Sequence, residues 1–211
     1  EIFKAAIDFW LWFSYKIFTL LDPNETLDTF EDINTVRQKH TKSEYLEYLS
    51  NSYLYKNYYI KIIDEVRDII SSKMTKPIEV KIDVDENGDI VYDPTTNTVY
   101  QSIHENMKST LIYLTFIDPY KTQTLLQAKI NEQLESAKQL NKIFPTVLNS
   151  ISWSAGCISG AMTETVETSF LVGFIKVLLG LCEIIKGKGN KAICASNIMY
   201  VVGQYTRFLN A

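Results

Sequence analysis

The chain is poor in the two residues that interrupt helices. Of its 211 residues only 8 are glycine and 5 are proline, which is about half of what usage of ~7% Gly and ~5% Pro would supply. Every glycine except Gly88 lies at or beyond Gly156, and the prolines are scattered singly. So few interruptions favour long helices and argue against a turn-rich β-sandwich.

Apolar residues recur at helical spacing along most of the chain. The pattern predicts helices over residues 2–21, 53–74, 102–116, 119–140, 145–162, 164–186 and 191–209. Asp118 followed by Pro119 is typical of a helix start, because Asp caps the helix and the missing N–H of Pro costs nothing at the first position. Gly187 and Gly189 can end one helix in a left-handed turn, and Asn190 can cap the next.

The spacing of these helices predicts an all-α fold, a HEAT-repeat α-solenoid of antiparallel helix pairs. A pair every ~40–47 residues is the period of HEAT or armadillo repeats, and each pair must bury its faces against its neighbours. We interpret residues 1–211 as a single fragment of such an array. Residues 1–21 form the inner helix of a preceding repeat, and further repeats cover 53–117, 119–162 and 164–209.

One acidic segment breaks the helical pattern. Ile78, Val80, Ile82 and Val84 alternate with charged residues, and the chain returns after Asn87-Gly88, which is the strongest short-range signal of a β-hairpin. We expect a hairpin inserted over residues 78–101, with the acidic residues Asp83, Asp85, Glu86 and Asp89. The same residues match the first half of an EF-hand loop, but Pro94 replaces the glutamate that would complete it. We therefore favour a solvated acidic hairpin that meets a basic surface and expect no metal site.

Charge and cysteine usage limit the class of protein. The net charge of −4 disfavours nucleic acid as a direct partner, because phosphate binding needs clustered Lys and Arg. The three cysteines, without paired spacing, indicate reduced intracellular thiols. The apolar run over residues 7–21 is interrupted by charges and shorter than the ~20 residues of a membrane span, so we expect a buried helix and no membrane partner.

No sequence motif indicates catalysis. His40 and His104 are the only histidines, and neither is framed as part of a Cys–His nucleophile pair. The chain also lacks a glycine-rich phosphate loop and the GxSxG and HExxH motifs. We therefore expect no enzyme activity and no cofactor.

The predicted helix 164–186 is apolar around most of its circumference. Two adjacent stripes follow from helical spacing, one of Phe170, Phe174, Val177, Leu178, Leu181 and Ile185, the other of Leu171, Val172, Ile175, Leu179 and Cys182. Together they are roughly twice as wide as the ~100° that docking on one side requires. The helix therefore either packs against two neighbours or presents one stripe as a groove. The next helix carries Lys191, Ala195, Met199 and Val202 along one edge, which suits an adaptable peptide groove.

Three runs in this region carry a specific resemblance. ISGAM at 158–162, FLVGFIKVLLGLCE at 170–183 and NKAICASNIMYVVGQYTRFL at 190–209 closely resemble the chromosome-region-maintenance exportins, nuclear export receptors of the importin-β (karyopherin) family. The likeness extends upstream through MTKPIEV at 74–80 and NMKSTLIYLTFID at 106–118, and it covers most of the chain from Tyr53 onward.

The resemblance implies a receptor that binds leucine-rich nuclear export signals of cargo proteins together with the GTP form of the Ran GTPase. It also implies contact with nuclear pore proteins and shuttling between nucleus and cytoplasm. In that family the signal enters a groove between outer helices of adjacent repeats, so the last repeat here carries half of it. The matching positions are Val172, Ile175, Lys176, Leu179, Cys182 and Glu183, with Lys191, Ala195, Ile198, Met199 and Phe208.

Two further expectations follow from the same resemblance. Cys182 would be the thiol that leptomycin-type electrophiles alkylate, and a nearby lysine would favour its thiolate. The acidic hairpin would match a loop that reaches across the inner surface and, with Ran, influences whether the groove is open. The alternative is a generic HEAT or armadillo scaffold that binds another protein partner.

Overall fold

The computed structural model describes residues 2–21, 55–76, 82–84, 90–92 and 98–208. Its elements in chain order are α1 (Ile2–Leu21), the π-helical turn η1 (Tyr55–Tyr59), α4 (Ile60–Lys73), β1 (Ile82–Val84), β2 (Ile90–Tyr92), α5 (Thr98–Ile117), α6 (Pro119–Leu140), α7 (Pro145–Cys157), α8 (Glu164–Ile184), α9 (Lys188–Gln204) and the 3₁₀ turn η2 (Thr206–Phe208). The predicted fold class, a helical array with one inserted hairpin, is confirmed.

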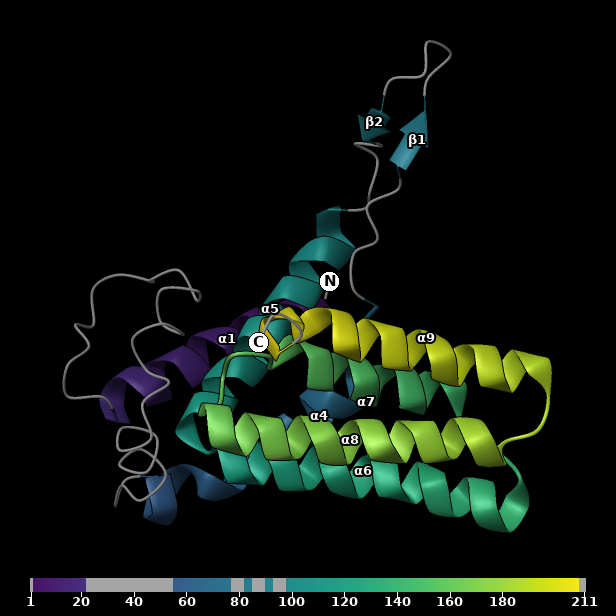
Figure 1. The fold of residues 1–211 in the computed structure, drawn as a ribbon. Helices are drawn as coiled ribbons and strands as arrows, with labels where there is room; N and C mark the ends of the chain where they lie inside the picture. The colour runs from purple at the N-terminus through teal and green to yellow at the C-terminus, as the bar shows by residue number, and fades with distance from the viewer. Residues whose placement is uncertain (1, 22–54, 77–81, 85–89, 93–97, 209–211) are drawn as a thin grey trace.

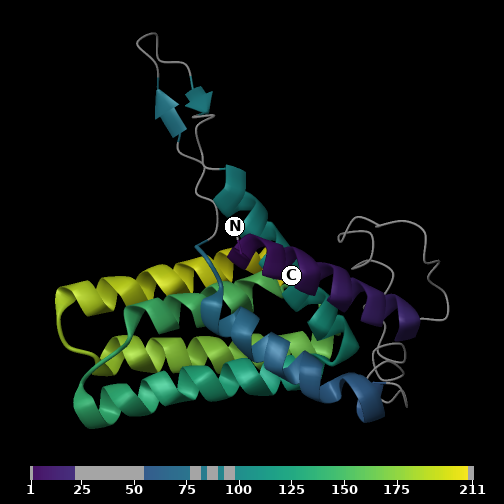
Figure 2. The same cartoon turned by 180° about the vertical axis from the view of Figure 1, so that it is seen from behind.

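The helices are arranged as stacked pairs (Figures 1 and 2). α4 packs on α5, α6 on α7, and α8 on α9, while α6 also lies along α8 and α7 along α9. α1 extends the array at the other end by packing on α5. Each helix therefore buries one side within its own pair and another side against the next pair, as in an α-solenoid.

Aromatic residues hold α1 against α5. The ring of Phe18, which is fully buried, lies 5.5 Å from that of Tyr113 and 5.7 Å from that of Phe116, measured between centroids. Tyr15 packs edge-on against the same Tyr113. Such pairs add to the free energy gained by burying their large apolar area, which explains why this face of α1 is part of the core. The prediction of a buried helix is correct for this face only, because Phe9, Trp12 and Leu20 of the same helix are each about half exposed.

Side-chain hydrogen bonds mark the start of α6 and the turn that leads into α7. The Asp118 carboxylate accepts a hydrogen bond from the Lys121 N–H at 3.0 Å, and Pro119 opens the helix, as the sequence predicts. α6 ends at Leu140 and is followed by the C-cap residue Asn141, whose backbone is left-handed with φ of 48°. The Phe144 N–H, just before α7, donates to Gln133 Oε1 of α6 at 3.1 Å, so the turn between the two helices is tied back to α6.

Several predicted helix ends are wrong. α5 begins at Thr98 and not at residue 102, so the hairpin insertion is shorter than the predicted 78–101. α7 ends at Cys157 and not at residue 162, because the chain turns through Gly160 with φ of 81°.

The turn before α9 uses a single glycine. Gly187 has a positive φ of 93°, as predicted, whereas Gly189 lies inside α9, which begins at Lys188 rather than at residue 191. Asn190 does not cap α9; its side-chain amide donates to the Lys186 carbonyl at 3.0 Å and closes the turn from within the helix.

The hairpin strands stand away from the helical body (Figure 1). β1 and β2 pair antiparallel, with Ile82 opposite Tyr92 and Val84 opposite Ile90. This pairing agrees with the alternation read from the sequence. The predicted Asn87-Gly88 turn lies outside the described residues.

Candidate functional site

α8 buries one of its two apolar stripes. Phe170, Phe174, Leu178, Leu181 and Ile185 are at most 1% exposed and belong to the core. The glycine-bearing edge of the helix lies beside α6, where a Cβ on Gly173 would be 3.5 Å from Gln127 Oε1 and one on Gly180 would be 3.9 Å from Leu134 Cδ1. The core and α6 together therefore account for two sides of α8.

The second apolar stripe faces outward. Val172 and Leu179 are each 47% exposed, although they are large and apolar. Ile175 and Cys182 are half-buried beside them. We call Val172, Ile175, Leu179 and Cys182 the exposed strip; the charged side chains of Lys176 and Glu183 lie on the same outer face of the helix.

α9 lies next to the exposed strip and contributes the other predicted groove residues (Figure 1). Lys191, Ala195 and Met199 are exposed, with Met199 at 75%, whereas Ile198 is half-buried. The Cys182 thiol donates to the Lys191 carbonyl oxygen at 3.9 Å, which joins the end of the strip to the start of α9. The structure thus brings the predicted residues of the two helices onto adjoining surfaces.

The other two cysteines are less accessible than Cys182. Cys157 and Cys194 are buried. Burial, and secondarily the nearby Cys182, raises the pKa of the Cys194 thiol, so Cys194 stays protonated near neutral pH. Cys182 is the most accessible thiol of the described residues.

Phe208, the last predicted groove residue, is half-buried in η2, next to Arg207, whose half-exposed side chain pairs with a buried carboxylate. Glu167 of α8 is fully buried, pairs with Arg207 and accepts the Gly160 N–H at 2.5 Å. The Arg207 guanidinium lies 4.8 Å from the centroid of the Phe208 ring. The sequence did not predict these contacts of Glu167 with Arg207 and Gly160. The only signal for them was a carboxylate in the first turn of α8.

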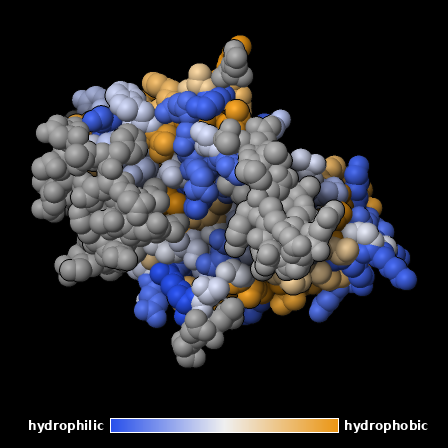
Figure 3. Space-filling model, turned by 90° about the horizontal axis from the view of Figure 1, so that it is seen from above, coloured by the Kyte–Doolittle hydropathy of each residue, from blue (hydrophilic) through white to orange (hydrophobic). Residues whose placement is uncertain are grey.

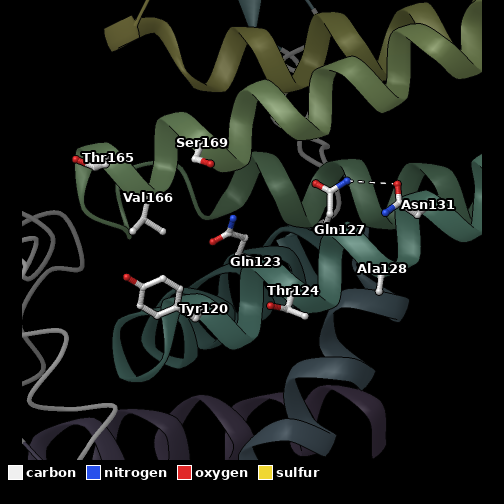
Figure 4. A pocket seen from close by; sticks show the side chains of 9 residues that line it. All are labelled: Tyr120, Gln123, Thr124, Gln127, Ala128, Asn131, Thr165, Val166 and Ser169. Atoms are coloured by element: carbon white, nitrogen blue, oxygen red, sulfur yellow. Dashed lines mark hydrogen bonds between the residues drawn. The ribbon is translucent and has the colours of Figure 1, made fainter.

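A shallow cavity of about 650 Å³ lies between α6 and α8 (Figure 4). Its lining is uncharged and consists of Tyr120, Gln123, Thr124, Gln127, Ala128, Asn131, Thr165, Val166 and Ser169. Gln127 donates to Asn131 at 3.4 Å along its wall. The cavity was not predicted, although Gln123, Gln127 and Asn131 recur at helical spacing. Its lining contains neither a nucleophile paired with a base nor a charged group.

Within the part of the chain that the structure describes, no group of three or more His, Cys, Asp or Glu side chains could hold a metal ion. Of the predicted acidic hairpin residues, Asp83 lies in β1, whereas Asp85, Glu86 and Asp89 lie outside the described residues. His104 is buried, its Nδ1 is 3.1 Å from the Thr75 carbonyl oxygen, and burial lowers its pKa. It is therefore a satisfied structural histidine that holds the chain at the end of α4.

α8 is also the one helix, among the described residues, that is long and apolar enough to cross a membrane. Only 28% of its most apolar stretch is buried, and its mean hydropathy is 1.7. α8 packs along α6 and α9, so apolar residues on two of its sides are explained by helix packing. Within the exposed strip, this packing leaves Val172 and Leu179 each 47% exposed, whereas Ile175 and Cys182 pack partly against the core.

Comparison with known proteins identifies the family. A model described as CRM1/Exportin repeat 2 matches residues 55–122, and one described as CRM1/Exportin repeat 3 matches residues 145–189. Exportin-1 of Drosophila melanogaster is 38% identical over 211 residues, which is 100% of this chain. The chain belongs to the CRM1/exportin family.

Other relatives extend the comparison across eukaryotes. Exportin-1 of Schizosaccharomyces pombe is 35% identical over 100% of the chain, and the Arabidopsis thaliana protein EXPORTIN 1A is 44% identical over 71% of it. The chain spans only 18% of the fly exportin and 19% of the yeast exportin. It is thus similar to about a fifth of these longer proteins. The exportin repeat 3 match spans α7 and α8, which includes the whole exposed strip.

Proposed function

We propose that this chain is part of a nuclear export receptor and that the exposed strip forms one wall of a groove for leucine-rich export signals of cargo proteins. The observation that carries the proposal is the strip itself, since the large apolar side chains of Val172 and Leu179 remain 47% exposed beside the buried stripe of the same helix. A signal peptide with apolar residues at i, i+3, i+4 and i+7 needs such a surface on which to place them. Lys176 and Lys191 at its margins suit acidic residues in the signal.

The other parts of the proposal follow from family membership. Binding would be coupled to the GTP form of Ran, with the acidic hairpin influencing the groove, and the receptor would shuttle between nucleus and cytoplasm through contacts with nuclear pore proteins. Cys182 would be the electrophile-reactive thiol at the end of the strip, and it would act by position and not in catalysis. DNA, RNA and membranes are not among the proposed partners.

The groove can be tested by titrating a fluorescent leucine-rich export peptide into the protein extended by the helix pair that follows. The variant Ile175→Asp/Leu179→Asp should weaken binding by tenfold or more, because each carboxylate would be buried unpaired against apolar side chains of the signal. Ile62→Asp/Ile69→Asp on α4 is the matched control, since both residues are exposed and apolar but distant in the fold.

The rate at which Cys182 is labelled gives a second, independent measure of peptide binding. A maleimide should label Cys182 in the free protein before it reaches the buried Cys157 and Cys194, and bound peptide should slow that labelling. Equal peptide affinity for the unmodified protein and the Ile175→Asp/Leu179→Asp variant, or equal loss in the α4 control, would rule out the groove. Labelling that bound peptide leaves unchanged would place the signal elsewhere.

A further inference from the structure

Two loops meet at one end of the molecule. The α6–α7 loop and the α8–α9 loop both lie at the end opposite the Leu21 end of α1 (Figures 1 and 2). The Lys186 N–H donates to the Asn141 side-chain oxygen at 3.3 Å, so the two loops are directly joined. Side chains from two successive helix pairs are therefore held on one surface.

This surface carries positive charge that no described carboxylate neutralises. Lys142, Lys186 and Lys188 are exposed and make no ion pair within the described ranges. Lys138, one turn earlier on α6, is different because it pairs with Glu135 at 2.7 Å. The local sequence explains the imbalance, since residues 136–163 and 184–211 contain neither Asp nor Glu.

Large exposed apolar side chains neighbour these lysines along the two loops. Leu140 is 68% exposed, Phe144 41% and Ile184 39%. The Lys142 ammonium group lies 4.8 Å from the centroid of the Phe144 ring, which places charge and aromatic surface side by side. We call Leu140, Lys142, Phe144, Ile184, Lys186 and Lys188 the loop-end patch. In the view from above, hydrophilic and hydrophobic residues adjoin at this end of the molecule (Figure 3).

We propose that the loop-end patch binds an acidic peptide segment that carries aliphatic or aromatic side chains. Three unpaired lysines attract carboxylates by charge complementarity, while Phe144, Leu140 and Ile184 offer apolar contacts that give such a segment its anchor. An extended polyanion such as nucleic acid fits less well, because the net charge of −4 repels it outside this small area. The patch shares no residue with the exposed strip, so peptide binding at the patch can be tested independently of peptide binding in the groove.

The test is a titration of the 211-residue chain with a fluorescein-labelled peptide of the sequence Glu-Asp-Leu-Glu-Asp-Phe-Glu-Asp. The variant Lys142→Glu/Lys186→Glu should bind it about tenfold more weakly or worse, because attraction becomes repulsion. Lys61→Glu/Lys73→Glu on α4 makes the same change in net charge at two other exposed lysines, and should change the affinity by less than about twofold. Circular dichroism of each variant checks that its helices are retained.

Further arms of the experiment separate the patch from other binding modes. A peptide with Ser in place of Leu and Phe should bind the unmodified chain more weakly, and so should the acidic peptide to Phe144→Ser. Equal affinity for the patch variant and the α4 control would overturn the proposal. Loss of binding in Ile175→Asp/Leu179→Asp with the patch variant unaffected would assign the peptide to the exposed strip and also overturn it. Binding to phosphatidylserine vesicles without binding to the peptide would make the patch a membrane contact and overturn the peptide assignment.

Discussion

Gly156 lies where α7 comes closest to α9. A Cβ at this position would be 2.5 Å from Tyr200 Cε1 and 2.9 Å from Gln204 Cγ, so only glycine fits without a shift of the α9 side chains. The sequence predicts such close contact for all the helical glycines between 156 and 203. The prediction holds at Gly156 but is wrong at Gly203, which has open space around it, and at Gly160, which lies outside the helices.

This difference gives a matched pair of substitutions. Gly156→Ala should lower the free energy of unfolding by about 1–3 kcal/mol, because the added methyl group overpacks the α7–α9 contact. Gly203→Ala should leave stability unchanged or raise it by up to about 1 kcal/mol, since alanine favours the helix and meets nothing. Urea denaturation followed by circular dichroism measures both. A Gly156→Ala protein as stable as the unmodified chain would show that Tyr200 moves aside without cost.

At the scale of elements, hydroxyl groups of α7 hold the end of α4. Ser150 Oγ donates to the Met74 carbonyl at 3.1 Å. Ser154 Oγ lies 3.2 Å from the Ser71 carbonyl oxygen and 2.8 Å from the Ser150 carbonyl oxygen of its own helix, so its single proton is shared between these two acceptors. The Met74 and Ser71 carbonyls belong to the end of α4, where no intrahelical donor remains. The serines have no recognisable pattern in the sequence, because their partners are about 80 residues away.

The helix offers its own control for this contact. Ser154→Ala should cost about 1–3 kcal/mol of unfolding free energy, because it leaves the Ser71 carbonyl buried without that donor. Ser152 is equally buried but its hydroxyl has no hydrogen-bond partner in the described structure, so Ser152→Ala should be neutral or stabilising. Thermal and urea unfolding of the two variants give the comparison, and equal effects would contradict the assigned role of Ser154.

For α8, the sequence predicted the two apolar stripes but not which of them is buried. Helical spacing separated its two apolar stripes correctly, since one is buried except for the half-buried Val177 and the other includes Val172 and Leu179 at 47% exposure. Spacing alone could not decide which stripe faces the core. The docking of α8 on α6 and α9 decides it, because this packing buries Phe170, Phe174 and Leu178 in the core. The side of α8 that carries Gly173 and Gly180 lies beside α6, where an added Cβ would make only ordinary van der Waals contacts.

For the whole molecule, packing between neighbouring helices governs stability. α1 packs on α5 at one end, and α8 packs on α6 and α9 at the other. In such an array, stability is approximately a sum of local terms, so damage at one end should be felt mainly there.

Hydrogen exchange can test this locality. Phe174→Ala removes a fully buried ring of α8 and should cost about 3–5 kcal/mol, with faster amide exchange in α6, α8 and α9 and little change in α1. Phe18→Ala is the reciprocal variant, since its ring is equally buried between α1 and α5 and should affect those helices instead. Uniform loss of protection in both variants would mean that the chain unfolds as one cooperative unit.

Charge is also distributed unevenly over the whole molecule. Residues 1–135 contain 22 acidic and 14 basic residues, whereas residues 136–211 contain 3 acidic and 7 basic ones. The positively charged part includes both the exposed strip and the loop-end patch. An acidic partner is therefore steered toward that end of the array and repelled from the other.

The sequence by itself determined the class of fold, most helices, the hairpin and the family, because periodicity, turn residues and extended similarity are local or linear properties of a chain. Only the tertiary structure decided which apolar stripe of α8 is exposed, which glycine is a packing contact, and that lysines of two loops share one surface with Phe144. These features depend on contacts between residues far apart in the chain. Such contacts form when helices dock on one another, so they cannot be predicted from the spacing of residues within a single helix.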